Sequence, residues 1–83
     1  MSRHQKAVER LLAKPKDFAW GELKLLMEMF GYELKMTGGS GRKFIHAATQ
    51  ATLFIHEPHP AKVLKAYQVR DVIGFLRQEE HIR

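Results

Sequence analysis

The spacing of apolar residues changes at Gly31, and this change restricts the possible folds more than any other feature of the sequence. Before Gly31, apolar residues recur every three or four positions, as on one face of a helix: Leu23, Leu26, Met27 and Phe30. After it, residues 32–36 (Tyr-Glu-Leu-Lys-Met) alternate between apolar and polar, which is typical of a half-buried strand. Gly31 itself suits the end of the helix, because glycine adopts the left-handed conformation with little strain. The chain is therefore expected to combine helices with a sheet.

Two amphipathic helices are predicted in the first part of the chain. The first covers residues 3–13 and ends before Pro15, because proline cannot continue the helical hydrogen-bond ladder. Its apolar face consists of Val8, Leu11 and Leu12. The second helix runs from about Trp20 to Phe30, and two further residues widen its apolar stripe: Leu25 and Met29.

Three strands are predicted to follow, at residues 32–36, 42–46 and 51–56. A glycine-rich turn at residues 37–41 joins the first two strands. Residues 47–50 connect the second strand to the third, and they lack the Asn-Gly or Asp-Gly pair that would specify the register of a hairpin.

A last helix completes the predicted fold. Residues 57–60 (Glu-Pro-His-Pro) end the third strand, and the helix then runs from Val63 or Ala66 to Glu79. Its inward face holds four apolar residues: Val69, Val72, Ile73 and Leu76. The order α-α-β-β-β-α describes an α+β fold in which a three-stranded antiparallel sheet packs on helices. With 83 residues, the chain is expected to form one domain, residues 1–83.

The charge balance favours a negatively charged partner. Fourteen Lys and Arg residues against nine Asp and Glu give a net charge of +5, which attracts phosphate backbones or acidic proteins. The absence of cysteine excludes a disulfide scaffold and a thiolate zinc site, and it agrees with a reducing cytoplasm. No apolar run approaches the roughly 20 residues of a membrane span. The charged residues 1–6 are not followed by the apolar stretch of a secretory signal, so a cytoplasmic protein is expected.

A glycine-rich segment, residues 38–43 (Gly-Gly-Ser-Gly-Arg-Lys), is the first candidate for chemistry. Backbone N–H groups exposed in such a turn, with Ser40, Arg42 and Lys43 beside them, can hold a phosphate of RNA. The phosphate-binding loop of nucleotide hydrolases is excluded, because that loop follows a strand, precedes a helix and ends in Lys-Ser/Thr. The alternative is a flexible hairpin whose cations are merely solvated.

Two histidines around a proline are the second candidate. His56 and His59 flank Pro58 at the end of the third strand, and imidazoles can act as general acid and base on RNA, whose own 2′-hydroxyl serves as the nucleophile. His46, at the end of the second strand, is a reserve that strand pairing can bring close to His56. The alternative is that these are surface histidines in a turn. A metal site is poorly supported, since only Glu57 accompanies the two histidines.

Eight basic residues in loops, at strand ends and near the start of the last helix can follow a nucleic-acid backbone: Lys14, Lys16, Lys35, Arg42, Lys43, Lys62, Lys65 and Arg70. Lys65 is the member of this set that is predicted to bind RNA alongside the glycine-rich turn. Most aromatic residues lie at core spacing and are expected in the core rather than stacked on bases: Trp20, Phe30, Phe44, Phe54 and Phe75. Tyr67 is expected to be more exposed.

Five short motifs follow one another at characteristic spacing: Asp17-Phe18-x-Trp20-x-Glu22-Leu23-x-x-Leu26, Phe30-Gly31-Tyr32, Gly39-Ser40-x-x-x-Phe44, His56-x-Pro58-His59-Pro60 and Leu64-Lys65-x-Tyr67-x-Val69. Together they resemble the HicA family of bacterial type II toxins, also called YcfA-like proteins. The resemblance covers about residues 16–80 and leaves the helix at 3–13 outside. It implies a fold similar to double-stranded RNA-binding domains and a ribosome-independent mRNA interferase activity, that is, an endoribonuclease that needs no metal or other cofactor. It also implies a HicB-like antitoxin as partner.

The resemblance further implies a catalytic histidine directly after the Gly-Ser pair, where this chain has Gly41. Glycine cannot transfer a proton. Three hypotheses follow. The preferred one is a divergent HicA/HicB-type toxin that binds and cleaves mRNA, with the chemistry on His56 and His59, or on His46. The others are a non-catalytic RNA-binding module, and a basic domain that binds an acidic protein and never RNA.

Overall fold

The computed structural model describes residues 3–83, and Met1 and Ser2, which begin the charged N-terminal segment, lie outside the described residues. The elements are, in chain order, α1 (Arg3–Leu12), α2 (Trp20–Met29), β1 (Tyr32–Gly38), β2 (Gly41–His46), β3 (Thr52–His56) and α3 (Ala66–Gln78). The predicted order α-α-β-β-β-α is confirmed, and the arrangement is consistent with a fold similar to double-stranded RNA-binding domains. No helix within residues 3–83 has the length and apolar character needed to span a membrane.

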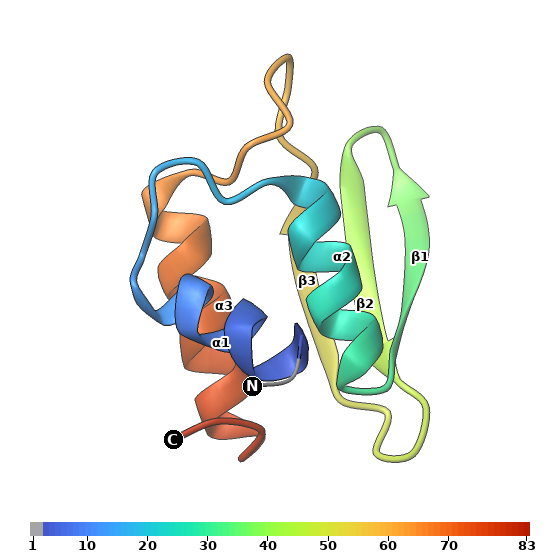
Figure 1. Ribbon diagram of the computed structural model, residues 1–83. Coiled ribbons are helices and arrows are strands. Elements are labelled where there is room, and N and C mark those ends of the chain that lie inside the picture. Colours follow the sequence, from blue (N-terminus) through green and yellow to red (C-terminus); the bar gives the residue numbers. More distant parts are fainter. Residues whose placement is uncertain (1–2) are drawn as a thin grey trace.

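The three strands form one antiparallel sheet in the order β1-β2-β3. α2 packs against β1 and α3 against β3, so the helices gather on one face of the sheet (Figure 1). Alternate residues of each strand point to opposite faces. On β3, Leu53 and Ile55 are buried beneath the helices, whereas Phe54 and His56 are exposed on the other face. The sheet therefore has one covered face and one open face.

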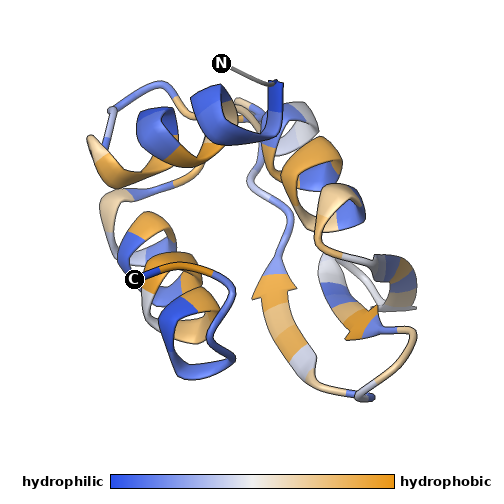
Figure 2. Cartoon of the chain, turned by 60° about the horizontal axis from the view of Figure 1, so that its bottom comes forward, coloured by the Kyte–Doolittle hydropathy of each residue, from blue (hydrophilic) through white to orange (hydrophobic). Residues whose placement is uncertain are grey.

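A single apolar core fills the space between the covered face and the helices. Fully buried residues of α2 form its centre: Leu23, Leu26 and Met27. The predicted inward face of α3 is confirmed, since each of its members is at most 2% exposed: Val69, Val72, Ile73 and Leu76. α1 joins the same core through Leu11, which is also fully buried. Figure 2 shows hydrophobic stretches of the helices turned toward this shared interior.

The predicted apolar faces of α1 and α2 include residues that do not face the core. Three residues that were expected to face the core are exposed: Leu12, Leu25 and Met29. Leu25 lies two positions after Leu23, and Met29 lies two positions after Met27, which is about 200° around the helix axis. These two side chains therefore point away from the sheet, and they line a hollow beside α1.

The β1–β2 turn is shorter than the sequence suggests. Gly38 still pairs with Gly41, so only Gly39 and Ser40 remain in the turn. Gly39 has a φ of +53°, which glycine adopts without strain. Gly41 approaches β1 closely, because a Cβ atom at this position would overlap the hydroxyl of Thr37 and lie 3.1 Å from the carbonyl oxygen of Gly38. A larger residue at position 41 therefore requires Thr37 to move.

Candidate functional site

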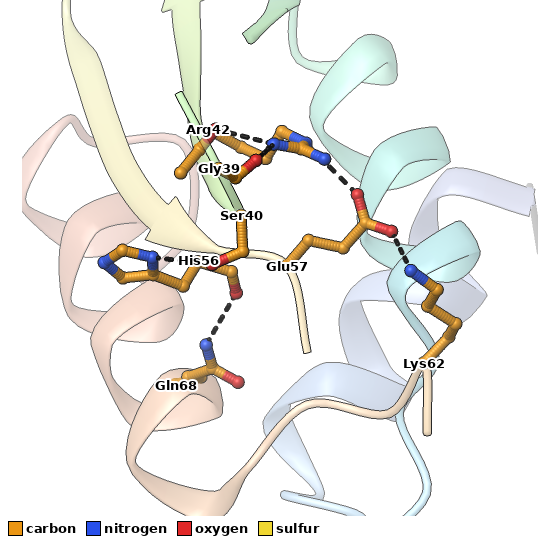
Figure 3. A network of polar contacts seen from close by, with 8 residues as sticks. Gly39, Ser40, Arg42, His56, Glu57, Lys62 and Gln68 are labelled. Atoms are coloured by element: carbon orange, nitrogen blue, oxygen red, sulfur yellow. Dashed lines mark hydrogen bonds and ion pairs between the residues drawn. The ribbon is translucent and has the colours of Figure 1, made fainter. Parts of the chain in front are cut away.

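Strand pairing joins the two segments that the sequence singled out. Gly41 of β2 pairs directly with His56 of β3, which places the end of β3 beside the glycine-rich turn. The Nδ1 atom of His56 lies 3.2 Å from the hydroxyl oxygen of Ser40 (Figure 3). The backbone N–H of Glu57 also donates to the Ser40 carbonyl oxygen at 2.9 Å. Residues 38–43 and the end of β3 at His56 and Glu57 thus form one site at one end of the sheet.

Gln68 of α3 fixes the backbone of His56. Its side chain is buried, with 4% of the residue exposed, and its Nε2 atom donates to the His56 carbonyl oxygen at 2.9 Å. Its Oε1 atom accepts from the backbone N–H of Lys65 at 3.0 Å, just before the first turn of α3. Sequence reasoning missed this residue. A Gln three positions after the N-cap is one half of the capping-box signature, but the N-cap here is Lys65 instead of Ser or Thr, so the sequence carries only a partial signal.

An ion-pair network connects the β1–β2 turn to the segment that follows β3. The Nε atom of Arg42 donates to the Glu57 carboxylate at 3.1 Å, and its Nη1 atom donates to the carbonyl oxygens of Gly39 and Gly41 at 3.0 and 2.8 Å. Lys62 donates to the other oxygen of Glu57. The hydrogen bond from Lys62 lowers the pKa of Glu57; burial opposes the shift, and the charges of Lys62 and Arg42 support it. The Arg42 and Glu57 side chains are only 13% and 15% exposed, so this network holds the turn onto the end of β3.

The open face of the sheet carries an exposed aromatic ring beside His56. Phe54 is 71% exposed, so the prediction that it belongs to the core is wrong. It lies two residues before His56 on the same face of β3, and it pairs across the ladder with Lys43. Tyr67 of α3 is 51% exposed. Two shallow hollows, of about 230 and 200 Å³, adjoin Phe54 and His56 on either side of β3, and Tyr67 lines the second.

His59 lies apart from His56 although it follows His56 by only three positions in the sequence. It is exposed in the segment between β3 and α3, and that segment projects from the body of the molecule in Figure 1. Among residues 3–83, no hydrogen bond, ion pair or ring contact joins the two histidines. The structure therefore gives His56 a defined place in the site and leaves His59 on a neighbouring loop.

His46 belongs to a different part of the molecule, so the idea that strand pairing brings it close to His56 is wrong. It pairs with Tyr32 at the opposite end of β2 and lies on the opposite face from His56. Its ring stacks on that of His81, with centroids 5.5 Å apart. His81 also shares a hydrogen bond of 2.9 Å with the Tyr32 hydroxyl. Burial lowers the pKa of His81, and the charge of His46 lowers it further.

The predicted basic residues divide into two groups. Lys35, Arg42 and Lys62 are ion-paired with glutamates. Four others line a hollow of about 460 Å³ between the α1–α2 connection and the start of α3, and none of them has an ion pair within residues 3–83: Lys14, Lys16, Lys65 and Arg70. Because Gln68 ties Lys65 to His56, this basic hollow adjoins the site. Lys43 is likewise unpaired in that part of the chain, and it lies on the open face.

The chemistry available at this end of the sheet is proton transfer beside cations. An exposed imidazole, a hydroxyl within reach of it and an unpaired lysine surround Gly41. Imidazole exchanges protons near neutral pH, and lysine attracts phosphate. Within residues 3–83, no three His, Cys, Asp or Glu side chains are grouped so that they could hold a metal ion.

A comparison with protein families identifies a family for this chain. The family model described as HicA toxin of bacterial toxin-antitoxin matches residues 20–78. The matched segment begins with α2 and ends with α3, so it contains the whole site and excludes α1. No curated protein and no solved structure gives a significant match.

Proposed function

Since the chain belongs to the HicA family of toxins of bacterial toxin-antitoxin systems, we propose that it binds mRNA and cleaves it as a metal-independent endoribonuclease. The observation that carries this proposal is the pairing of Gly41 with His56. The family resemblance implies a catalytic histidine at position 41. Directly opposed residues of an antiparallel pair point to the same face, with Cβ atoms about 4.5–5.5 Å apart. His56 therefore offers an imidazole from the neighbouring strand at the place where the family histidine is expected.

His56 is the proposed general base. In the tautomer that donates Nδ1–H to the Ser40 hydroxyl oxygen, the Nε2 atom of His56 carries the free lone pair. This nitrogen takes the proton of a ribose 2′-hydroxyl, the 2′-oxygen attacks the adjacent phosphorus, and the bond to the 5′-oxygen breaks. The leaving oxygen receives a proton, which we assign to His59 on the adjoining loop. The products are a 2′,3′-cyclic phosphate and a 5′-hydroxyl end.

The surrounding polar residues have separate proposed roles. Ser40 and Lys43 contact the phosphate at the reaction centre, and Lys65 contacts a neighbouring phosphate from the edge of the basic hollow. A cation beside the phosphorus stabilises the charge that develops on the oxygens. Arg42 is assigned a positioning role, because Glu57 and two carbonyl oxygens already occupy its guanidinium.

The family also implies a partner protein. A toxin of a toxin-antitoxin system is paired with an antitoxin, and we propose a HicB-like protein that covers the basic surface around His56 in the cytoplasm. RNA and the antitoxin would then compete for the toxin. Release of bound RNA by the purified antitoxin would support this placement, and simultaneous binding of both would contradict it.

The central experiment compares four proteins on one substrate. A long unstructured RNA is incubated, with EDTA present, with wild type, His56→Ala, His59→Ala and His46→Ala, the last serving as a matched histidine control from the far end of the sheet. Loss of a general acid or base lowers the rate about 10²- to 10⁴-fold, so His56→Ala and His59→Ala are expected to lose cleavage. His46→Ala is expected to retain it, with folding checked by circular dichroism. Cleavage by His56→Ala at the wild-type rate would overturn the assignment.

Gly41 supports one alternative, a non-catalytic RNA-binding module that has the family surface without its catalyst. Installing the missing side chain tests it, and Gly41→His must be combined with Thr37→Ala because the new Cβ would overlap the Thr37 hydroxyl. RNA cleavage by this double variant, together with an inactive wild type, would establish the alternative. Cleavage by wild type that depends on His56 would exclude it.

A further inference from the structure

The open face of the sheet displays an aromatic ring that the core does not use. Phe54 is 71% exposed, although Leu53 and Ile55 on either side of it are 8% exposed. Its ring makes no ring contact with another aromatic side chain within residues 3–83. Its flat face is therefore available to a ligand that stacks.

The neighbours of Phe54 fit a nucleotide. Lys43 lies directly across the ladder, and His56 lies two positions along the same face of the strand. Aromatic side chains on open sheets stack single-stranded RNA bases, and cations beside them hold the backbone. A base on Phe54 would place the sugar and phosphate that follow it next to His56. We propose that Phe54 is a stacking platform for an unpaired base beside the cleaved bond, and that the substrate is consequently single-stranded RNA.

The charges on the two sides of β3 orient the bound RNA. The hollow toward α3 contains the carboxylate of Asp71 together with Tyr67. The hollow toward β2 contains Gly41 and Arg42 and no carboxylate. Phosphate is repelled by Asp71 and attracted by Lys43. The backbone therefore passes over the β2 side, and the base extends across Phe54 toward α3.

This inference rests on the proposed function, and it predicts more than that function requires. A duplex keeps its bases stacked inside the helix, so it cannot offer a base face to Phe54. Base–aromatic stacking contributes about 1–3 kcal/mol per base, so Phe54→Ala is expected to weaken binding of single-stranded RNA roughly 5- to 150-fold. Phe54→Tyr should retain binding. Phe54→Leu, which keeps apolar surface without an aromatic face, should lose affinity as Phe54→Ala does.

A fluorescent probe tests the contact directly. Phe54→Trp is titrated with a 2′-O-methyl oligoribonucleotide, which cannot be cleaved, and with the same strand in a duplex. We expect the single strand, but not the duplex, to quench the fluorescence of the introduced tryptophan. Wild type is the first control, because its single tryptophan, Trp20, is 6% exposed in the core. Met36→Trp is the second, because Met36 is 70% exposed on β1 and faces the other side of the sheet from Phe54.

Three outcomes would contradict a stacking role for Phe54. The first is that single strand and duplex quench the tryptophan fluorescence of Phe54→Trp equally, and the second is that the single strand quenches Phe54→Trp and Met36→Trp equally. The third is that Phe54→Ala binds the single strand with wild-type affinity. If Phe54→Ala loses only the antitoxin and keeps RNA, the ring belongs to a protein interface and the platform is wrong. Failure of the proposed function is distinguishable, because wild type would then not cleave RNA, whether or not it binds it, whereas failure of the stacking role alone leaves His56-dependent cleavage intact.

Discussion

Arg42 and Lys43 are adjacent in β2 but point to opposite faces, and substitution of each should therefore have a different effect. Arg42→Ala removes the hydrogen bond to Glu57 and those to the carbonyl oxygens of Gly39 and Gly41. Lys43→Ala removes a side chain on the open face that has no ion pair within residues 3–83. The first change should affect folding, and the second should affect RNA binding.

The magnitude for Arg42 follows from its contacts. A hydrogen bond between charged groups contributes about 1.5–3 kcal/mol, and bonds to carbonyl oxygens contribute about 0.5–1.5 kcal/mol each. Lys62 still neutralises the Glu57 carboxylate in the variant, so the expected loss in the free energy of unfolding is about 2–4 kcal/mol. In a domain of this size each kcal/mol lowers Tm by about 4–8 °C, which gives a decrease of roughly 10–30 °C.

The assays are urea denaturation followed by circular dichroism, and RNA binding measured by fluorescence anisotropy at several salt concentrations. Lys43→Ala should stay within about 0.5 kcal/mol of wild type in stability. Its plot of log affinity against log salt should become shallower by about 0.7, the value for one contact to a single-stranded phosphate. Wild-type stability of Arg42→Ala, combined with a shallower salt plot, would refute this reasoning and return Arg42 to the phosphate contacts.

Three further predictions concern stability. The lowered pKa of Glu57 means that the carboxylate stabilises the folded protein above its ordinary pKa of 4.5, and that this stabilisation is lost as pH falls through the lower pKa of the folded state. Glu57→Gln should therefore flatten the dependence of the free energy of unfolding on pH in this acidic range. The lowered pKa of His81 affects stability at a higher pH. Below the ordinary value of 6.5 the unfolded chain binds the proton more readily than the folded protein, so the free energy of unfolding falls. His81→Phe should remove this fall, and an unchanged dependence of the free energy of unfolding on pH would contradict the prediction. Gln68→Leu leaves the His56 carbonyl oxygen unpaired and should cost about 1–3 kcal/mol in urea denaturation; a matched surface variant, Gln78→Leu, should have little effect.

The order of helices and strands could be predicted because apolar spacing directly reports which face of an element is buried. The orientation of Phe54 could not be predicted in the same way. Leu53, Phe54 and Ile55 form a continuous apolar run, which a strand covered on both faces also has, so the run does not show which face stays open.

The composition of the site was predictable only in part. Both segments around Ser40 and His56 were found from their residue types, but their meeting depends on the β2–β3 register, which residues 47–50 do not specify by any turn signature. The same register places His46 at the far end of the sheet. The difference between Arg42 and Lys43 depends on which face of β2 the helices cover, and this is a property of the whole fold.

The packed core of this protein begins before the segment that it shares with the family. The segment shared with the family starts at residue 20, yet Leu11 of α1 is fully buried in the common core, and Arg10 binds both Asp17 and Glu22. Cutting the chain at residue 20 would open the apolar interior beneath α2 to water. The family match and the packed core therefore have different boundaries in this protein: the match covers residues 20–78, whereas the core extends back to Leu11 of α1.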